Sequence, residues 1–215
     1  MIESDREERK VALKKHAVNP LDYRSSEYSL DPIFLPRWSP RAMSGEPLDH
    51  ALLLLCFEAA RWAPSAGNRQ ERLFLYAHRE TAAFEQFFNL LDSGNQEWNI
   101  NASVLIIALS DTLNNQGKFI PTHAHDTGLA VENLLLQACE IGLVAHPMAG
   151  YSGDRARIEL NIPERYQPQC MIAIGIAGDV SALSEFNQSR EIPSQRKPLD
   201  EVIHEGGFAP ENLRR

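Results

Sequence analysis

A long helical stretch between Pro121 and Gly142 places the strongest constraint on the fold of this chain. Thr122 stands at its N-cap position, Asp126 lies in the first turn, and Gly142 marks its end. Apolar residues encircle it: Leu129, Ala130, Val131, Leu134, Leu135, Leu136, Ala138, Cys139 and Ile141. A helix that is apolar on nearly all sides must be buried on all sides. In a chain of 215 residues, we expect a partner subunit to cover one of its faces.

Shorter patterns predict the elements around this helix. Apolar residues at three- and four-residue steps predict a helix between Ser44 and Trp62, with Pro47 in its first turn and Pro64 beyond its end. The continuous apolar run Ala102–Leu109 predicts a strand covered on both faces. The remaining expected elements are a short helix near Glu7–Lys15, a strand at Arg72–His78, a helix over about Thr81–Leu91, a loop at Ser93–Trp98, a turn at Ala145–Tyr151, a small helix near Asp154–Leu160 and a last core strand at Cys170–Gly175.

Composition excludes several classes of protein. The chain is 43% hydrophobic and 23% charged, which is typical of one ordinary globular domain. No window approaches the roughly 20 consecutive apolar residues of a membrane span, and the charged N-terminus lacks the apolar core of a signal peptide, so we expect a cytoplasmic protein. The formal net charge of −8 argues against a nucleic-acid partner, because phosphates would be repelled.

The cysteines and two neighbouring histidines do not predict a metal centre. Cys56, Cys139 and Cys170 are odd in number, far apart and set among apolar residues, which favours buried free thiols. His123 and His125 have no further ligands at a suitable spacing, so we expect them to be surface or capping histidines.

Two polar segments are candidates for a ligand site. In Arg61–Gln70, Pro64 ends the preceding helix and Gly67 permits an unusual φ, so a shaped loop can present backbone N–H groups. Its short, uncharged donors and acceptors suit the edge of a flat heterocycle, and they are Ser65, Asn68 and Gln70. Arg37–Arg41 places two guanidinium groups and a hydroxyl within five residues, a spacing able to converge on one phosphate. A plain polar turn and a solvated basic turn are the other interpretations.

The first of these segments resembles the A-P-S-x-x-N-x-Q signature of the nitroreductase family, flavoproteins that carry FMN and are reduced by NADH or NADPH. The family usually continues with Pro-Trp, where this chain has Glu71 and Arg72. Four other segments are similar to family motifs: R-x-S-x-R/K at 37–41, G-N-Q-x-W at 94–98, P-x-x-G-[FY] at 147–151 and a basic-x-Pro ending at 196–198. The resemblance covers about 37 to 202.

This resemblance implies a role for each matched segment. Arg37, Ser39 and Arg196 would hold the FMN phosphate, and Arg41 would face N1 and O2 of the flavin. The complete implied set of cofactor-binding residues is Arg37, Trp38, Ser39, Arg41, Pro64, Ser65, Ala66, Asn68, Gln70, Asn95, Met148, Ala149, Gly150 and Arg196. Because the flavin carries the electrons, no catalytic side chain is expected.

At the ring, Asn95 would contact the polar edge of the flavin, and the backbone N–H groups of Ala149 and Gly150 would approach N5. Other members carry a Lys where this chain has Trp98, so one positive charge near the flavin is missing.

The implied fold is α+β, a three-layer α/β/α sandwich with a mostly antiparallel central sheet, built as an intertwined homodimer with two FMN sites across the interface. Residues 1–36 would be an N-terminal extension lying on the body, and 37–215 the FMN-binding domain with a C-terminal arm from about 190. The implied activity is that of an oxidoreductase: NAD(P)H reduces bound FMN, which then reduces a small electron-poor acceptor, a nitroaromatic or a quinone, by a ping-pong mechanism.

Two other function classes stay open. A non-catalytic flavin-binding or flavin-sensing protein would share the same pocket. A serine hydrolase using Ser65 is less favoured, because a nucleophile elbow runs strand, Ser, helix, whereas here a helix precedes and a strand follows. Ser194 and Lys197 match S-x-x-K, but neither S-D-N nor K-T-G accompanies them. The chain contains neither G-x-G-x-x-G nor a P-loop, which disfavours a separate nucleotide site.

Overall fold

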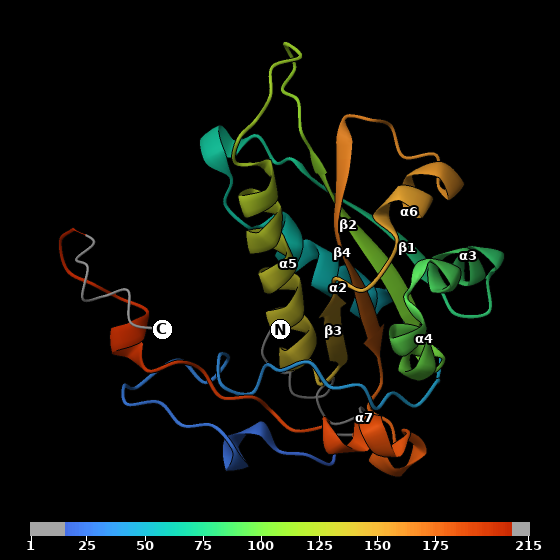
Figure 1. Ribbon diagram of the computed structural model, residues 1–215, viewed down its shortest axis with the longest axis vertical. Helices are drawn as coiled ribbons and strands as arrows, with labels where there is room; N and C mark the ends of the chain where they lie inside the picture. Colours follow the sequence, from blue (N-terminus) through green and yellow to red (C-terminus); the bar gives the residue numbers. More distant parts are fainter. Residues whose placement is uncertain (1–15, 208–215) are drawn as a thin grey trace, which may run out of the picture.

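Four antiparallel strands form the centre of the fold in the computed structural model, which describes residues 16–207 (Figure 1). They are β1 (Arg72–His78), β2 (Val104–Asp111), β3 (Val144–Met148) and β4 (Tyr166–Gly175), and their order in the sheet is β1-β2-β4-β3. All three strand pairs are antiparallel, as the sequence predicted for most of the sheet. The helix expected near Glu7–Lys15 lies outside the described residues.

Helices cover both faces of this sheet. On one face lie α2 (His50–Arg61) and α5 (His123–Glu140), and on the other lie α3 (Ala82–Leu90), α4 (Ser93–Asn99) and α6 (Gly153–Glu159). Shorter elements are η1 (Pro20–Asp22), η2 (Ala66–Asn68), η3 (Val180–Ala182), α7 (Glu185–Ser189) and η4 (Leu199–Glu201). The α+β, three-layer architecture predicted from the sequence is therefore confirmed.

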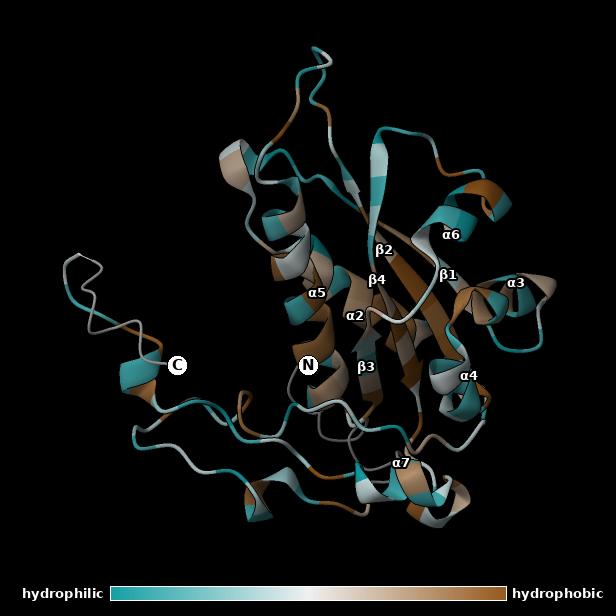
Figure 2. Cartoon of the chain, in the orientation of Figure 1, coloured by the Kyte–Doolittle hydropathy of each residue, from teal (hydrophilic) through white to brown (hydrophobic). Residues whose placement is uncertain are grey.

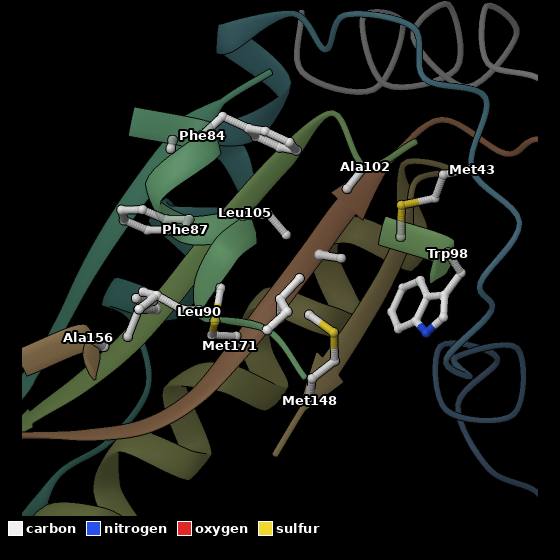
Figure 3. Close-up of a cluster of buried hydrophobic side chains, with 14 of the residues drawn as sticks. Met43, Phe84, Phe87, Leu90, Trp98, Ala102, Leu105, Met148, Ala156 and Met171 are labelled. Carbon is white, nitrogen blue, oxygen red and sulfur yellow. The ribbon is translucent and has the colours of Figure 1, made fainter. Parts of the chain in front are cut away.

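Strand β2 explains why the layers hold together. Side chains alternate across a strand, so Leu105 and Ile107 enter the cluster beneath α3 and α4, while Ile106 and Ala108 enter the cluster beneath α2 and α5. All four are fully buried, as expected for an apolar run covered on both faces. Figure 2 shows the brown, hydrophobic colour along β2 and along the lower part of β4, whose upper end is teal. Figure 3 shows the aromatic, aliphatic and sulfur side chains of the first cluster.

Several local predictions were wrong. The segment expected as a loop at Ser93–Trp98 is helix α4, and the expected turn at Ala145–Tyr151 begins with strand β3. Pro147 lies inside β3, where its missing N–H is tolerated because β3 is an edge strand. Helix α2 begins only at His50, where the Asp49 side chain caps Ala51, so Pro47 lies ahead of the helix and not in its first turn.

Helix α5 also departs from expectation. Thr122 occupies its N-cap position, but the backbone there is helical and the hydroxyl makes no capping hydrogen bond. Within one chain Leu129, Leu136 and Cys139 are only half-buried, and the cover of one face by a partner subunit stays a prediction. His123 is neither a surface nor a capping residue: it is buried, and its Nδ1 lies 2.8 Å from the hydroxyl of Ser110.

Other findings concern cysteines, metals and membranes. Cys56, Cys139 and Cys170 are free thiols, with Cys56 buried and the other two half-buried. Between residues 16 and 207, no three or more His, Cys, Asp or Glu side chains are grouped so that they could hold a metal ion. Over the same range, no helix combines the length and apolar character needed to cross a membrane.

Residues 16–36 and the C-terminal tail after α7 run side by side along the edge of the molecule below α5 (Figure 1). The Nε2 of His16 lies 3.1 Å from a carboxylate oxygen of Glu191, and the side chain of Gln195 donates to the carbonyl of Tyr23. The tail thereby joins the extension to the body of the domain.

Candidate functional site

The loop between α2 and β1 is held in an unusual backbone conformation. Gly67, Asn68 and Gln70 have φ values of 60°, 53° and 60°, all in the left-handed region. Outside glycine this region is costly, and such strain is found preferentially at ligand-binding segments. The hydroxyl of Ser65 accepts a hydrogen bond of 3.0 Å from the backbone N–H of Gln70, which closes the loop on itself.

Asp126 anchors this loop to helix α5. Its carboxylate oxygen accepts a hydrogen bond of 2.9 Å from the backbone N–H of Ala66. Burial alone would raise the pKa of Asp126, but the N–H of Ala66 and the ring of His125 outweigh it, so the pKa lies below its ordinary value. The sequence identified Asp126 only as a first-turn acid, because the contact with Ala66 spans 60 residues.

The Arg37–Arg41 segment is fixed by a buried carboxylate that no motif revealed. Glu191 is 2% exposed and accepts hydrogen bonds from the backbone N–H groups of Arg41 and Ala42, the latter at 2.9 Å. The Nη1 of Arg41 donates to the carbonyl of Arg190 at 3.1 Å. Trp38 is buried and meets the ring of His16 edge-on, so its backbone is the part that remains available to a ligand.

Both arginines predicted for the phosphate lie in one neighbourhood. Arg37 and Arg196 both act electrostatically on Arg24: burial first, then Arg196 and Arg37, lower the pKa of its guanidinium. The Nε of Arg37 is 3.4 Å from a carboxylate oxygen of Glu132 on α5. Arg196 is exposed, and its Nη1 donates to backbone carbonyls of its own segment.

The residues predicted for the ring edge also contact one another. The side-chain amide of Asn95 donates to the carbonyl of Gly150 at 2.9 Å, and the backbone N–H of Asp92 donates to the same oxygen at 3.1 Å. A Cβ on Gly150 would lie 2.5 Å from Nδ2 of Asn95, so only glycine fits here without moving that amide. Met148 is buried, as Figure 3 shows, whereas Ala149 is exposed.

His146 connects this ring-edge group to the Arg37–Arg41 segment. Its Nδ1 lies 3.1 Å from the carbonyl of Pro40, and because a carbonyl only accepts, Nδ1 carries the proton. The ring packs 4.5 Å from that of Trp98. Burial lowers the pKa of His146 to about 4, so the imidazole stays neutral at neutral pH. Trp98 is buried beside Met148 and supplies no charge.

Within one chain, the predicted residues therefore fall into two groups. Arg37–Arg41, Arg196 and the Asn95–Gly150 pair are linked through Glu191 and His146. The loop Pro64–Gln70 is attached instead to the N-terminal end of α5, through the contact of Ala66 with Asp126. In Figure 1 the short helix η2 of this loop lies at the end of α5 opposite to the tail.

The two departures from the usual family sequence lie beside this loop. Glu71 is buried, and neither of its carboxylate oxygens has a hydrogen-bond partner among the described residues. The guanidinium of Arg72 donates to the carbonyl of Arg61. Glu71 and Arg72 line a cavity of about 420 Å³ with Gln70, and this cavity includes no residue of the other group.

Comparisons with known proteins agree with the resemblance to the nitroreductase family that the motifs indicated. The model of the nitroreductase family matches residues 35–176. A solved structure described as an oxidoreductase containing FMN is 43% identical, covers 86% of this chain and 96% of its own, and has a TM-score of 0.83. A nitroreductase family protein from Clostridium difficile 630 is 21% identical over 80% of this chain and 95% of its own, with a TM-score of 0.62, a likeness of fold alone.

Two curated relatives are also similar. An uncharacterised 15.4 kDa protein from Mycolicibacterium smegmatis is 31% identical over 124 residues, 57% of this chain and 82% of that protein. A protein from Ralstonia nicotianae, which has been proposed to be an NADH dehydrogenase/NAD(P)H nitroreductase, is 23% identical over 145 residues, 59% of this chain and 74% of that protein.

Proposed function

The chain belongs to the nitroreductase family, whose model matches residues 35–176, and on this premise we propose that it is an FMN-dependent oxidoreductase. NADH or NADPH would be the electron donor, and a small electron-poor molecule of nitroaromatic or quinone type would be the acceptor. The 43% identical structure, described as containing FMN, supports the cofactor, and the Ralstonia nicotianae relative supports the donor.

One observation carries this proposal: candidate phosphate ligands and candidate ring ligands are joined in the same part of the molecule. The hydrogen bond between His146 and Pro40 ties the segment of Arg37 to the strand that leads to Gly150. A flavin mononucleotide needs a cationic group for its phosphate and uncharged donors for its ring, and these are the groups that the contact brings together.

The residues present fit FMN at both ends. In a protein of net charge −8, Arg37 and Arg196 are both near enough to Arg24 to lower the pKa of its guanidinium, and such a group of cations suits a dianionic phosphate. At the other end, the absence of a Cβ on Gly150 lets Asn95 and the backbone approach closely. When bound, FMN would supply the chemistry, accepting hydride from the donor and passing the electrons to the acceptor.

The chain's own residues would bind and orient this cofactor. Arg37, Ser39 and Arg196 would hold the phosphate, and Arg41 would neutralise charge at the pyrimidine edge. Asn95 would hydrogen-bond the ring edge, and the backbone N–H groups of Ala149 and Gly150 would approach the reactive centre of the ring. We propose no acid, base or nucleophile.

We further propose that the active form is an intertwined homodimer. The loop Pro64–Gln70 of one copy would complete the site formed by Arg37, Asn95 and Gly150 of the other, because a single chain holds these residues in two groups. Large apolar side chains remain exposed on α2, at its end and on β1, namely Leu54, Trp62, Leu73 and Tyr76. A second copy would bury them together with the half-buried face of α5.

In this proposal, residues 37–215 form the FMN-binding domain, and 1–36 form an extension on its surface. We place its activity in the cytoplasm, where the nicotinamide donors are supplied. The hydrolase alternative finds no support in the hydrogen bonds: within residues 16–207 the Ser65 hydroxyl has one hydrogen bond, from the N–H of Gln70, and none with a histidine. A non-catalytic flavin-binding protein differs only in turnover, which kinetics decides.

The absorption spectrum of the purified protein tests the proposal. We expect a flavin band that is released on denaturation and restored when FMN is added to the apoprotein, and oxidation of NADH or NADPH that depends on an added quinone or nitroaromatic. A colourless protein that does not take up FMN would overturn the proposed function. Bound FMN without turnover by any donor would favour the non-catalytic alternative.

A further inference from the structure

Arg24 lies in the N-terminal extension, ahead of the residues that the family model matches, yet its side chain contacts both candidate phosphate segments. Its Nη1 donates to the carbonyl of Arg37 at 2.7 Å and to that of Leu35 at 3.2 Å. Its Nε donates to the carbonyl of Ser194 at 2.9 Å, two residues before Arg196. One guanidinium thereby connects the segment of Arg37 to the tail that carries Arg196.

The charges of Arg37 and Arg196 both act on the guanidinium of Arg24. The pKa of Arg24 is lowered first by burial, and then by the charges of Arg196 and Arg37. The carboxylate of Glu132, whose side chain is 51% exposed, lies near Arg37, and Glu140 lies just over two turns further along the same helix. Cations held together at a cost in mutual repulsion form a site for an anion that carries more than one charge.

The Nη2 group of Arg24 is available to a ligand, as far as residues 16–207 are concerned. Its Nε and Nη1 are engaged by carbonyl oxygens, whereas its Nη2 donates no hydrogen bond to any residue between 16 and 207. A planar guanidinium held by two of its nitrogen atoms is fixed in orientation, so its remaining N–H groups point in one direction at little entropic cost.

We propose that Arg24 is a positioning residue of the FMN phosphate site: it holds the segments of Arg37 and Arg196 together and adds a third positive charge. This inference rests on the proposed function. It assigns the extension a role in selecting FMN over riboflavin, which lacks the phosphate.

The test is fluorescence titration of the apoprotein with FMN and with riboflavin. Arg24→Ala should weaken FMN binding about 10-fold or more, comparably to Arg37→Ala and Arg196→Ala, and change riboflavin binding by less than about 2-fold. Arg24→Lys should fall between wild type and Arg24→Ala, because an ammonium keeps the charge but cannot bridge the two segments. The control is Arg155→Ala, which removes the same charge from α6, where Arg155 pairs with Glu159, and should leave both affinities unchanged.

Three outcomes would overturn the inference. Equal losses for FMN and riboflavin in Arg24→Ala would show that Arg24 supports the fold or the ring. Unchanged FMN binding would show that Arg24 has no role in binding the phosphate. Equal affinity of the wild type for FMN and riboflavin would show that no phosphate site exists. If Arg24→Ala does not fold, Arg24→Lys decides. The inference requires the ratio of its FMN affinity to its riboflavin affinity to be lower than that of the wild type. A wild-type protein that binds neither flavin would instead overturn the proposed function.

Discussion

The carboxylate of Glu191 accepts the backbone N–H of Arg41 at both oxygens, at 2.7 and 3.0 Å, across 150 residues of sequence. The same buried carboxylate accepts the N–H of Ala42 and lies 3.1 Å from Nε2 of His16. It therefore fixes the backbone from which Arg41 would reach the pyrimidine edge of FMN, and it joins the extension, the basic segment and the tail at one point.

We expect Glu191→Gln to destabilise the protein by about 2–3 kcal/mol, because a neutral amide offers one acceptor oxygen to several N–H donors. The substitution loosens Arg41, which would contact the ring, and not the residues that would hold the phosphate. The affinities for FMN and riboflavin should therefore fall together. Urea unfolding and flavin titration measure the two effects. Glu185→Gln, on the exposed side of α7, is the control and should change neither. A selective loss of FMN alone would contradict this assignment.

Glu191 also predicts a loss of stability in acid. Burial alone would raise its pKa, but hydrogen bonds from His16, Ala42 and Arg41 outweigh burial and leave the pKa below the ordinary value. A lowered pKa in the folded state stabilises the protein above the pKa of the unfolded chain, and this contribution is lost as the pH falls through the lowered value. The loss below the ordinary glutamate value of 4.5 should be smaller in Glu191→Gln than in wild type.

His146 predicts a second loss of stability, at a higher pH than the loss that Glu191 causes. Its pKa is lowered by burial from 6.5 to about 4, so the unfolded chain takes up a proton in this interval while the folded protein does not. The free energy of unfolding is therefore highest above pH 6.5 and declines as the pH falls towards 4. At pH 5 it should be about 2 kcal/mol lower. Urea unfolding at pH 7 and pH 5 measures it. In His146→Gln this difference should shrink, whereas in His125→Gln, at an exposed position, it should persist.

The sequence predicted the elements whose pattern is local. Strand β1 occupies the expected residues 72–78, because its apolar run is bounded by polar turns, and α5 follows its long apolar repeat. Helix α4 was missed because Ser93–Asn99 has no apolar period, and β3 because it is short and contains Pro147. These two elements are held by their tertiary contacts, which no local pattern records.

The same distinction applies to the candidate site. The motifs predicted Arg37, Asn95 and Gly150 as site residues, because these predictions depend only on spacing along the chain. Glu191 and Arg24 were missed, because each acts on residues that are brought near only by the fold. A buried glutamate in a polar tail and an arginine in an extension without periodicity look like any other surface charge in a single sequence.

Gly150 and Asn95 should behave as one unit. Gly150→Ala places a Cβ 2.5 Å from Nδ2 of Asn95, so the amide must move away from its contact with the carbonyl. We expect Gly150→Ala and Asn95→Ala each to weaken the binding of FMN and of riboflavin about 10-fold. The double variant should bind little more weakly than either single variant, which corresponds to a coupling energy of about 1 kcal/mol. Gly94→Ala is the control, since a Cβ there meets nothing within 4 Å. Additive losses would show that the two residues act separately.

The steady-state kinetics should be ping-pong. The sequence offers no second nucleotide motif, so donor and acceptor are expected to occupy the same face of the flavin in turn. Initial rates measured over a grid of NADH or NADPH and quinone concentrations should give parallel double-reciprocal lines. Lines that intersect in the absence of product would show that both substrates bind together, which excludes a single shared face.

A mixing experiment tests whether the site takes residues from two chains. Arg37→Ala alters the phosphate group of residues, and Asn68→Ala alters the loop on the N-terminal end of α5, so either homodimer should bind FMN weakly. In a mixed dimer, one site would carry both substitutions and the other would carry neither. Unfolding and refolding the two variants together should therefore restore about a quarter of all sites to wild-type affinity, given random pairing of two chains.

Titration with FMN measures the recovered sites as a separate high-affinity phase, and each variant refolded alone is the control. Light scattering should give the mass of two chains throughout. If Arg37 and Asn68 served the same site from one chain, every site in the mixture would still carry a substitution. The absence of a high-affinity phase, or a protein that remains monomeric with FMN bound, would mean that the loop reaches the flavin within its own chain.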